Sequence, residues 1–377
     1  MIDGFCDPAF AGVRDVFAAA LAAGDDLGAA VAVFADGRCV VDLWGGVADD
    51  RAGRPWLRDT PCVTFSATKA VTAVAALLLA ERGRLAVDAP VADYWPEFAA
   101  HGKDGVSVEH VLSHQAGLPS FARPMTVKEA ADPAAMADQL AGQPPEWRPG
   151  TAHGYHALTF GWLVGELIRR VDGRPVGRFV REELAAELEI GVPEARLPAL
   201  ARLVAGRPMK PDDLPTDLAT VARVVAAAQD PSSPMQRSTA NPPASFNKPA
   251  VLTAGWPAAG LVCTARALAD FYRRLVDGSL LGRAAVGEAI RERVRGPDRT
   301  LVSPTAFGLG FMRPAANMWL PPAARASAFG HPGASGALGL GDLEAGIAFA
   351  YVPNLTRPAL GDRRAYRLVD ATYAALG

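Results

Sequence analysis

A serine and a lysine lie three residues apart at the start of a long apolar segment. Ser66 and Lys69 belong to the sequence FSATK of residues 65–69, and residues 70–79 are mostly Ala, Val and Leu. If this segment is a helix, the two side chains share one face. An amine that loses its proton can then deprotonate the hydroxyl, and the helix dipole stabilises the developing alkoxide. The pair predicts acyl transfer on Ser66, and the alternative is that Ser66 only caps a helix.

A tyrosine precedes a second apolar segment. Tyr155 stands with His156 in the sequence GYHA of residues 154–157, just before the predicted helix over 158–171. A nearby ammonium lowers the pKa of a phenol, so we expect Tyr155 to share the serine's proton with Lys69. The alternative is a tyrosine packed in a core with its hydroxyl bonded. His156 either lines a cleft or faces the other side of the turn.

A glycine-dense segment, FGHPGASG at residues 329–336, leads into a predicted strand. Glycines allow a backbone to pass close to a ligand, and a strand-edge N–H can point at an oxyanion. A plain glycine turn is the alternative.

In this order and at these separations, the three segments resemble the serine β-lactamase and penicillin-binding-protein superfamily. Within it they are most similar to the class C β-lactamase-like esterases, the family VIII carboxylesterases. The resemblance implies that Ser66 is the nucleophile and that Lys69 and Tyr155 form its base. It also implies that the backbone N–H groups of Ser66 and Ala334 form the oxyanion hole.

Two departures from class C β-lactamases concern the substrate. Their Tyr-x-Asn is replaced by a sequence that ends in Ala157, and their Lys-Thr-Gly by His331-Pro332-Gly333. We expect His331, Gly333 and His156 to contact the substrate. An imidazole is largely neutral at pH 7 and is a weak anchor for a β-lactam carboxylate, although lower pH should charge it. The resemblance therefore implies an uncharged ester substrate and weak or no β-lactamase activity.

Composition excludes other classes of function. The 377 residues carry a net charge of −2, and 21% are charged without a long run of one sign, so neither nucleic acid nor an anionic membrane is expected as a partner. The N-terminus has no basic segment followed by an apolar core, which predicts a cytoplasmic protein. The sequence does not indicate an oligomeric state.

No metal or organic cofactor is expected. Four scattered cysteines predict neither a disulfide framework nor a zinc site. His110 and His114 are four apart but have no third ligand at matching spacing, so we expect capping or core hydrogen bonds from them. Trp44, Trp147 and Trp256 are candidates for the wall of an acyl pocket, although most tryptophans pack in cores.

The predicted elements imply an α/β fold. Strands are expected at both ends of the chain, and mainly helices and loops between them. We expect an antiparallel sheet with terminal helices from residues 1–65 and 250–377, a helical lobe over 66–249, and the active site in the cleft between them. The expected helices are 8–23, 70–83, 108–114, 158–171, 266–276 and 364–375; the expected strands are 29–34, 39–44, 306–312, 337–341 and 346–351. Prolines over 205–257 predict long surface loops.

The sequence thus predicts a β-lactamase-like serine hydrolase that cleaves short-chain carboxylic esters through an acyl-enzyme on Ser66. An amide or β-lactam hydrolase and an acyltransferase are the alternatives within this fold. A binding module that retains the fold is the alternative without catalysis, but such a protein would normally have lost Ser66, Lys69 or Tyr155, and all three are present.

Overall fold

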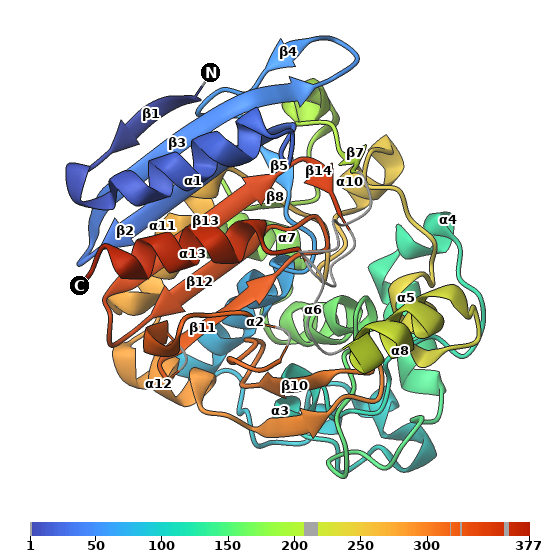
Figure 1. The fold of residues 1–377 in the computed structure, drawn as a ribbon. Helices are drawn as coiled ribbons and strands as arrows, with labels where there is room; N and C mark the ends of the chain where they lie inside the picture. Colours follow the sequence, from blue (N-terminus) through green and yellow to red (C-terminus); the bar gives the residue numbers. More distant parts are fainter. Residues whose placement is uncertain (1, 207–217, 317, 325, 358–361) are drawn as a thin grey trace.

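An antiparallel sheet built from both ends of the chain organises the fold (Figure 1). The structure is a computed structural model and describes residues 2–206, 218–316, 318–324, 326–357 and 362–377. The strand order is β1-β3-β2-β13-β12-β11, with β4 paired to β3. The strands are β1 (Ile2–Cys6), β2 (Gly28–Ala35), β3 (Arg38–Asp49), β4 (Arg54–Pro55), β11 (Ala328–Pro332), β12 (Leu338–Asp342) and β13 (Ile347–Pro353). The predicted hairpin is confirmed as β2–β3, which turns at Asp36 and Gly37 with positive φ angles of 47° and 76°.

Helices cover both faces of this sheet (Figure 1). Val31 and Val33 of β2 pack into a core with α1 (Ala11–Ala22) and α13 (Arg364–Ala374). Ala32 and Phe34 of the same strand face the other core, which contains α11 (Ala265–Val276) and α2 (Thr68–Glu81). Because both faces are buried, β2 is apolar throughout instead of alternating.

The middle of the chain is mainly helical and packs beside the sheet (Figure 1). Every residue of α2 from Thr68 to Leu79 is buried. The other helices of this part are α3 (Val108–Leu112), α4 (Val127–Ala130), α5 (Pro133–Gly142), α6 (Thr159–Asp172), α7 (Val176–Phe179), α8 (Leu218–Gln229), α9 (Pro234–Thr239) and α10 (Pro249–Ala254), and α12 (Arg283–Ile290) follows α11. The single-turn and π elements are η1 (Pro8–Phe10), η2 (Val91–Asp93), η3 (Pro96–Gly102), η4 (Val180–Leu184), η5 (Glu194–Ala199) and η7 (Pro322–Ala324).

The prediction of long loops over 205–257 is wrong for the described part of that segment. It contains α8, α9 and α10, and Pro234 and Pro249 each stand in the first turn of a helix. Proline is favoured there because an N–H in the first turn of a helix has no acceptor within the helix, so its absence in proline loses no hydrogen bond. The prolines therefore start helices here instead of breaking them.

A small second sheet connects the middle of the chain to the main sheet. Strand β8 (Leu261–Cys263) pairs with β5 (Cys62–Val63) on one side and β6 (Glu189–Ile190) on the other. The strand predicted over 306–312 is shorter: β10 (Pro304–Phe307) pairs with β9 (Val294–Pro297), and the chain then turns through Gly310. Two short strands, β7 (Val204–Ala205) and β14 (Leu355–Thr356), complete the set. The lobe boundaries expected at 65/66 and 249/250 stay a prediction.

Candidate active site

The predicted nucleophile, Ser66, stands in a tight turn between β5 and α2. Ser66 precedes the first residue of α2 by two positions, and Phe65 before it has a φ of 49°, a conformation that costs energy for a side chain of this size. The turn is fixed to β8 because Thr64 N donates to Leu261 O (2.9 Å) and Leu261 N donates to Thr68 Oγ1 (2.9 Å). These bonds hold Ser66 at the surface of a cavity that it lines.

Lys69 is completely buried beneath the serine. Its Nζ lies 3.2 Å from Ser66 Oγ, 2.7 Å from Ala157 O and 3.0 Å from Ala258 O. Burial holds the pKa of Lys69 well below its ordinary value. A neutral amine has two N–H groups and one lone pair. The two carbonyls take the N–H groups, so the lone pair faces the Ser66 hydroxyl and can accept its proton.

Tyr155 adjoins both groups. Lys69 Nζ lies 4.7 Å from the centre of its ring, and the ring stacks on Phe307 at 6.0 Å. The expectation that the lysine lowers the pKa of this phenol is wrong: burial raises the pKa of Tyr155, and a hydrogen bond with Ser66 offsets this only in part. The same burial, which lowers the pKa of Lys69, disfavours its charged form and so weakens the charge expected to act on the phenol. Tyr155 is therefore a neutral phenol that can pass a proton on.

His331 is placed beside Tyr155 at the end of β11. Its Nδ1 lies 2.8 Å from Pro332 O, and because a carbonyl only accepts, this nitrogen carries the proton. Nε2 therefore accepts from the Tyr155 hydroxyl, 3.4 Å away. Burial, together with the nearby Lys69, lowers the pKa of His331 to about 3. The expectation that mild acid charges this imidazole is accordingly wrong.

The glycine-dense segment forms the turn between β11 and β12. A Cβ at Gly333 would lie 2.1 Å from Thr64 O, so only glycine lets this turn approach the loop of Ser66 so closely. Gly333 and Ala334 both line the cavity with Ser66. Within the described ranges, neither the Ser66 N–H nor the Ala334 N–H has a hydrogen-bond acceptor. Both amides are free to bind an oxyanion.

His156 does not line the cavity. Its ring is buried, with Nδ1 2.7 Å from Gly154 O and Nε2 accepting from Leu118 N at 2.9 Å. Both ring nitrogens are thus occupied by backbone groups. The expectation that His156 contacts the substrate is therefore wrong. The imidazole instead fixes the loop around Leu118 to the segment that carries Tyr155.

Two further side chains position Tyr155, and sequence reasoning missed both. Ser238 Oγ of α9 donates to Tyr155 O (3.1 Å) and accepts from Ala157 N (3.0 Å), and Asp298 Oδ1 accepts from Tyr155 N (3.1 Å). Ser238 lies in the proline-rich segment that predicted loops, and Asp298 lies far along the chain. No spacing rule connects either of them to residue 155.

The cavity at these residues has a volume of about 770 Å³ and a mostly apolar wall. Trp256 lines it, as expected, but Trp44 and Trp147 do not, and Trp319 supplies a second indole. Other apolar side chains of the wall are Phe65, Leu158, Val224, Met235, Phe246, Leu301 and Met312. No cluster of three or more His, Cys, Asp or Glu side chains suited to a metal occurs in the described part of the chain. His110 instead caps α3 together with Ser107.

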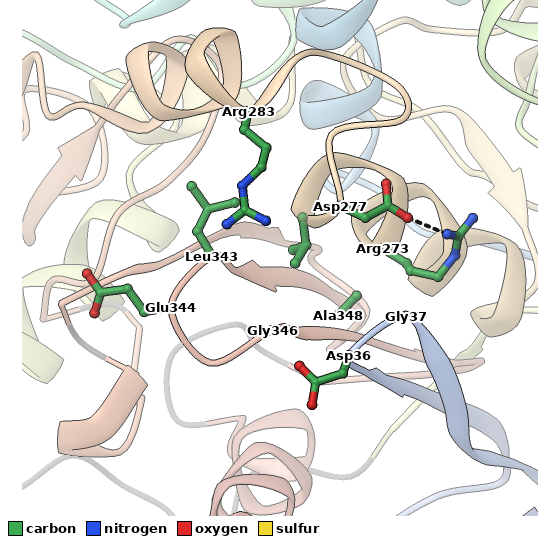
Figure 2. A pocket seen from close by; sticks show the side chains of 10 residues that line it. Asp36, Gly37, Arg273, Asp277, Arg283, Leu343, Glu344, Gly346 and Ala348 are labelled. Atoms are coloured by element: carbon green, nitrogen blue, oxygen red, sulfur yellow. Dashed lines mark hydrogen bonds and ion pairs between the residues drawn. The ribbon is translucent and has the colours of Figure 1, made fainter.

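A smaller cavity of about 270 Å³ lies between α11, α12 and the β2–β3 turn (Figure 2). Charged side chains surround it, among them Asp36, Arg273, Asp277, Arg283 and Glu344, and Arg273 pairs with Asp277. None of the described residues that line it is a serine or a lysine, so we assign the predicted acyl transfer to the larger cavity. Among the described residues, no helix is both long enough and apolar enough to cross a membrane.

Comparison with known proteins places the chain in a family. Residues 13–374 match the family described as Beta-lactamase. An esterase/β-lactamase called LipL from Mycobacterium tuberculosis is 38% identical over 362 residues, which cover 93% of this chain and 82% of LipL. A penicillin-binding-protein homologue from Caulobacter crescentus is 38% identical with a TM-score of 0.86, and a family VIII carboxylesterase is 33% identical with a TM-score of 0.87; both comparisons cover 100% of each chain.

A buried lysine beside a serine at the start of a helix, next to an antiparallel sheet covered by helices, is the arrangement of a β-lactamase-like serine hydrolase. The chain belongs to the β-lactamase family. The predicted family and fold class are confirmed, and the predicted class of serine ester hydrolase agrees with the names of these relatives.

Proposed function

We propose that this protein is a carboxylesterase that hydrolyses uncharged, small-molecule esters through an acyl-enzyme on Ser66. The observation that carries the proposal is the position of Lys69 Nζ, completely buried, bonded to two carbonyls and 3.2 Å from Ser66 Oγ. A lysine held in this way is a base, because its neutral form is favoured.

Acylation follows from the hydrogen-bond geometry. Lys69 takes the proton of Ser66, and Oγ attacks the ester carbonyl carbon. The carbonyl oxygen becomes an oxyanion, which the N–H groups of Ser66 and Ala334 stabilise. When the intermediate collapses, the C–O bond to the alcohol breaks, and the leaving oxygen takes a proton from Tyr155. The Lys69 ammonium then gives a proton back to Tyr155. The product of this half-reaction is an acyl-enzyme in which Lys69 and Tyr155 are both neutral again.

Deacylation uses the same groups with water in place of the alcohol. The Lys69–Tyr155 pair accepts a proton from water as its oxygen attacks the acyl carbon, and the proton then returns to Ser66 Oγ as the acid departs. No charge accumulates on the enzyme over the cycle. No step requires a metal or an organic cofactor.

The choice of an uncharged ester depends on His331 and Ala157. The neutral imidazole of His331 cannot form an ion pair with a substrate carboxylate. Ala157 has no side-chain amide that could hydrogen-bond to an amide group of the substrate. The apolar wall of the 770 Å³ cavity also favours uncharged acyl and alcohol groups. Hydrolysis of β-lactams and acyl transfer to an alcohol are the competing activities of the same acyl-enzyme, and LipL carries both esterase and β-lactamase in its name.

A substrate panel tests the proposal. We would measure kcat/KM for p-nitrophenyl esters of increasing acyl length beside a chromogenic cephalosporin. The expected result is ester turnover well above cephalosporin turnover. Preference for the cephalosporin, or no turnover of any ester, would contradict it.

A further inference from the structure

A buried arginine contacts the turn between β11 and β12 that carries the Ala334 N–H. Arg364, at the start of α13, donates from Nη2 to Ser335 O (2.9 Å), the carbonyl that follows Ala334. It also forms two hydrogen bonds with Asp362 (2.9 and 2.6 Å) and one with Asp26 (2.7 Å). The exposed fractions of these three side chains are 3%, 4% and 1%. The guanidinium is therefore held in one orientation, away from water.

Planar peptide groups connect this arginine to the free N–H of Ala334. The carbonyl of Ser335 and the N–H of Gly336 belong to one peptide plane, and Gly336 N donates to Gly333 O at 2.9 Å. The carbonyl of Gly333 and the N–H of Ala334 belong to the next plane. A continuous series thus runs from Arg364 through two peptide groups to Ala334, a residue that lines the cavity.

We propose that Arg364 is a positioning residue for the oxyanion hole: through the Ser335–Gly336 and Gly333–Ala334 peptide groups it orients and polarises the Ala334 N–H. The inference rests on the proposed esterase function, because it concerns the oxygen that develops charge in that reaction. Hydrogen bonds in series polarise one another, so a cation at the start of the series strengthens the last donor. The planar fork of arginine also fixes direction, which a lysine does less well.

The packing of the turn supports this role. Gly336 has a φ of 92°, and a Cβ at this position would lie 2.4 Å from Asp362 Oδ2 and 2.6 Å from Arg364 Nη2. The turn is thus seated directly on the Arg364–Asp362 pair. Ala334 itself is exposed to the cavity, so its N–H depends on this buried support and not on its own side chain.

The test compares two arginines of the same cluster. Arg364→Gln removes the cation behind the turn. Arg357→Gln is the matched control, because Arg357 pairs with Asp25 (2.9 Å) and, among the described residues, no hydrogen bond joins it to the turn. We would measure the affinity of an arylboronic acid, which forms a tetrahedral adduct with the serine, the kcat and KM of a neutral ester, and the carbonyl stretching frequency of a ¹³C-labelled acyl-enzyme.

We expect Arg364→Gln to weaken boronate binding and to lower kcat, each by about tenfold, since a donor that is weakened but not removed costs less than a deleted one. KM should change little, and the carbonyl frequency should shift upward as its hydrogen bonds weaken. Arg357→Gln should show none of these effects.

Equal effects of the two substitutions, or an unshifted carbonyl frequency in Arg364→Gln, would overturn the inference. If Arg364→Gln does not fold, Arg364→Lys and Gly336→Ala decide, because both disturb the contact with the turn and should raise the carbonyl frequency; no shift in either overturns it. A wild-type protein that forms no boronate or acyl adduct would instead contradict the proposed function.

Discussion

In the proposed mechanism, Lys69 and Tyr155 act as one proton-transfer unit. Lys69 donates to two backbone carbonyls and faces Ser66 with its lone pair, while Tyr155 lies between Ser66 and His331. The motifs predicted that Ser66, Lys69 and Tyr155 lie close together. They could not predict the protonation states, because these depend on burial by residues from other parts of the chain.

We predict that Lys69→Ala and Tyr155→Phe each lower kcat/KM by about a thousandfold or more, and that the double variant is little worse than either. Either substitution interrupts the same proton path, so the second has little left to remove. Single-turnover and steady-state kinetics of the three variants measure this coupling. Multiplicative losses would mean that one of the two residues has a structural role only.

A second prediction concerns the charge at position 331. His331→Lys combined with Ala157→Asn should raise kcat/KM for a β-lactam relative to a neutral ester by about one to two orders of magnitude, because an ammonium can pair with the β-lactam carboxylate. In the wild type the ratio of the two constants should be constant from about pH 5.5 to 8, since the pKa of His331 is lowered to about 3 and the imidazole stays neutral throughout.

Both substrates share the titration of Lys69, so it cancels in this ratio. Ala157→Asn alone serves as the control for added bulk. The interpretation is wrong if the wild type already prefers the β-lactam, or if the double variant leaves the ratio unchanged.

At the scale of elements, the site depends on contacts between segments far apart in sequence. Hydrophobic periodicity and turn residues predicted α1, the β2–β3 hairpin, α2, α6, α11 and α13, because each has a local signal. Ser238 in α9 and Asp298 carry no such signal, since they act only once folding brings them to the Tyr155 backbone. The prediction that His156 contacts the substrate was wrong for the same reason. Its position next to Tyr155 in the sequence does not determine the direction of its ring.

The packing of α6 on the segment before β8 gives a prediction at this scale. A Cβ at Gly161 would lie 2.4 Å from Ala258 N, so Gly161→Ala must move the backbone whose carbonyl, Ala258 O, holds Lys69. We expect kcat/KM to fall by about tenfold to a hundredfold, as small displacements of catalytic groups do. Gly165→Ala on the same helix is the control, because its nearest new contact is an ordinary 3.6 Å. Equal activity of the two variants would contradict the assignment.

At the scale of the whole molecule, one core joins the sheet to the helices. The same buried cluster contains Ala32 and Phe34 of β2 together with residues of α2 and α6. The predicted lobes therefore share a core, and we expect them to unfold together.

Lys103 tests this cooperativity. It is completely buried, and its Nζ donates to Ala100 O (2.7 Å), Ala141 O (2.9 Å) and Gln143 O (2.7 Å), which ties η3 to α5. Lys103→Met leaves three buried carbonyls without a donor and should lower the free energy of unfolding by about 3 kcal/mol or more. Calorimetry should show one transition at lower Tm, and Lys128→Met at an exposed position should leave it unchanged. Two separate transitions, with only one displaced, would contradict a shared core.

The covalent intermediate on Ser66 is the central claim, and intact-mass spectrometry after treatment with an ester-mimicking organophosphonate tests it most directly. The account predicts one adduct per wild-type chain, mapped by peptide digestion to Ser66. It also predicts no adduct on Ser66→Ala, whose esterase turnover should fall by several orders of magnitude because the attacking hydroxyl is gone. An adduct on another residue, or undiminished turnover by Ser66→Ala, would contradict the account.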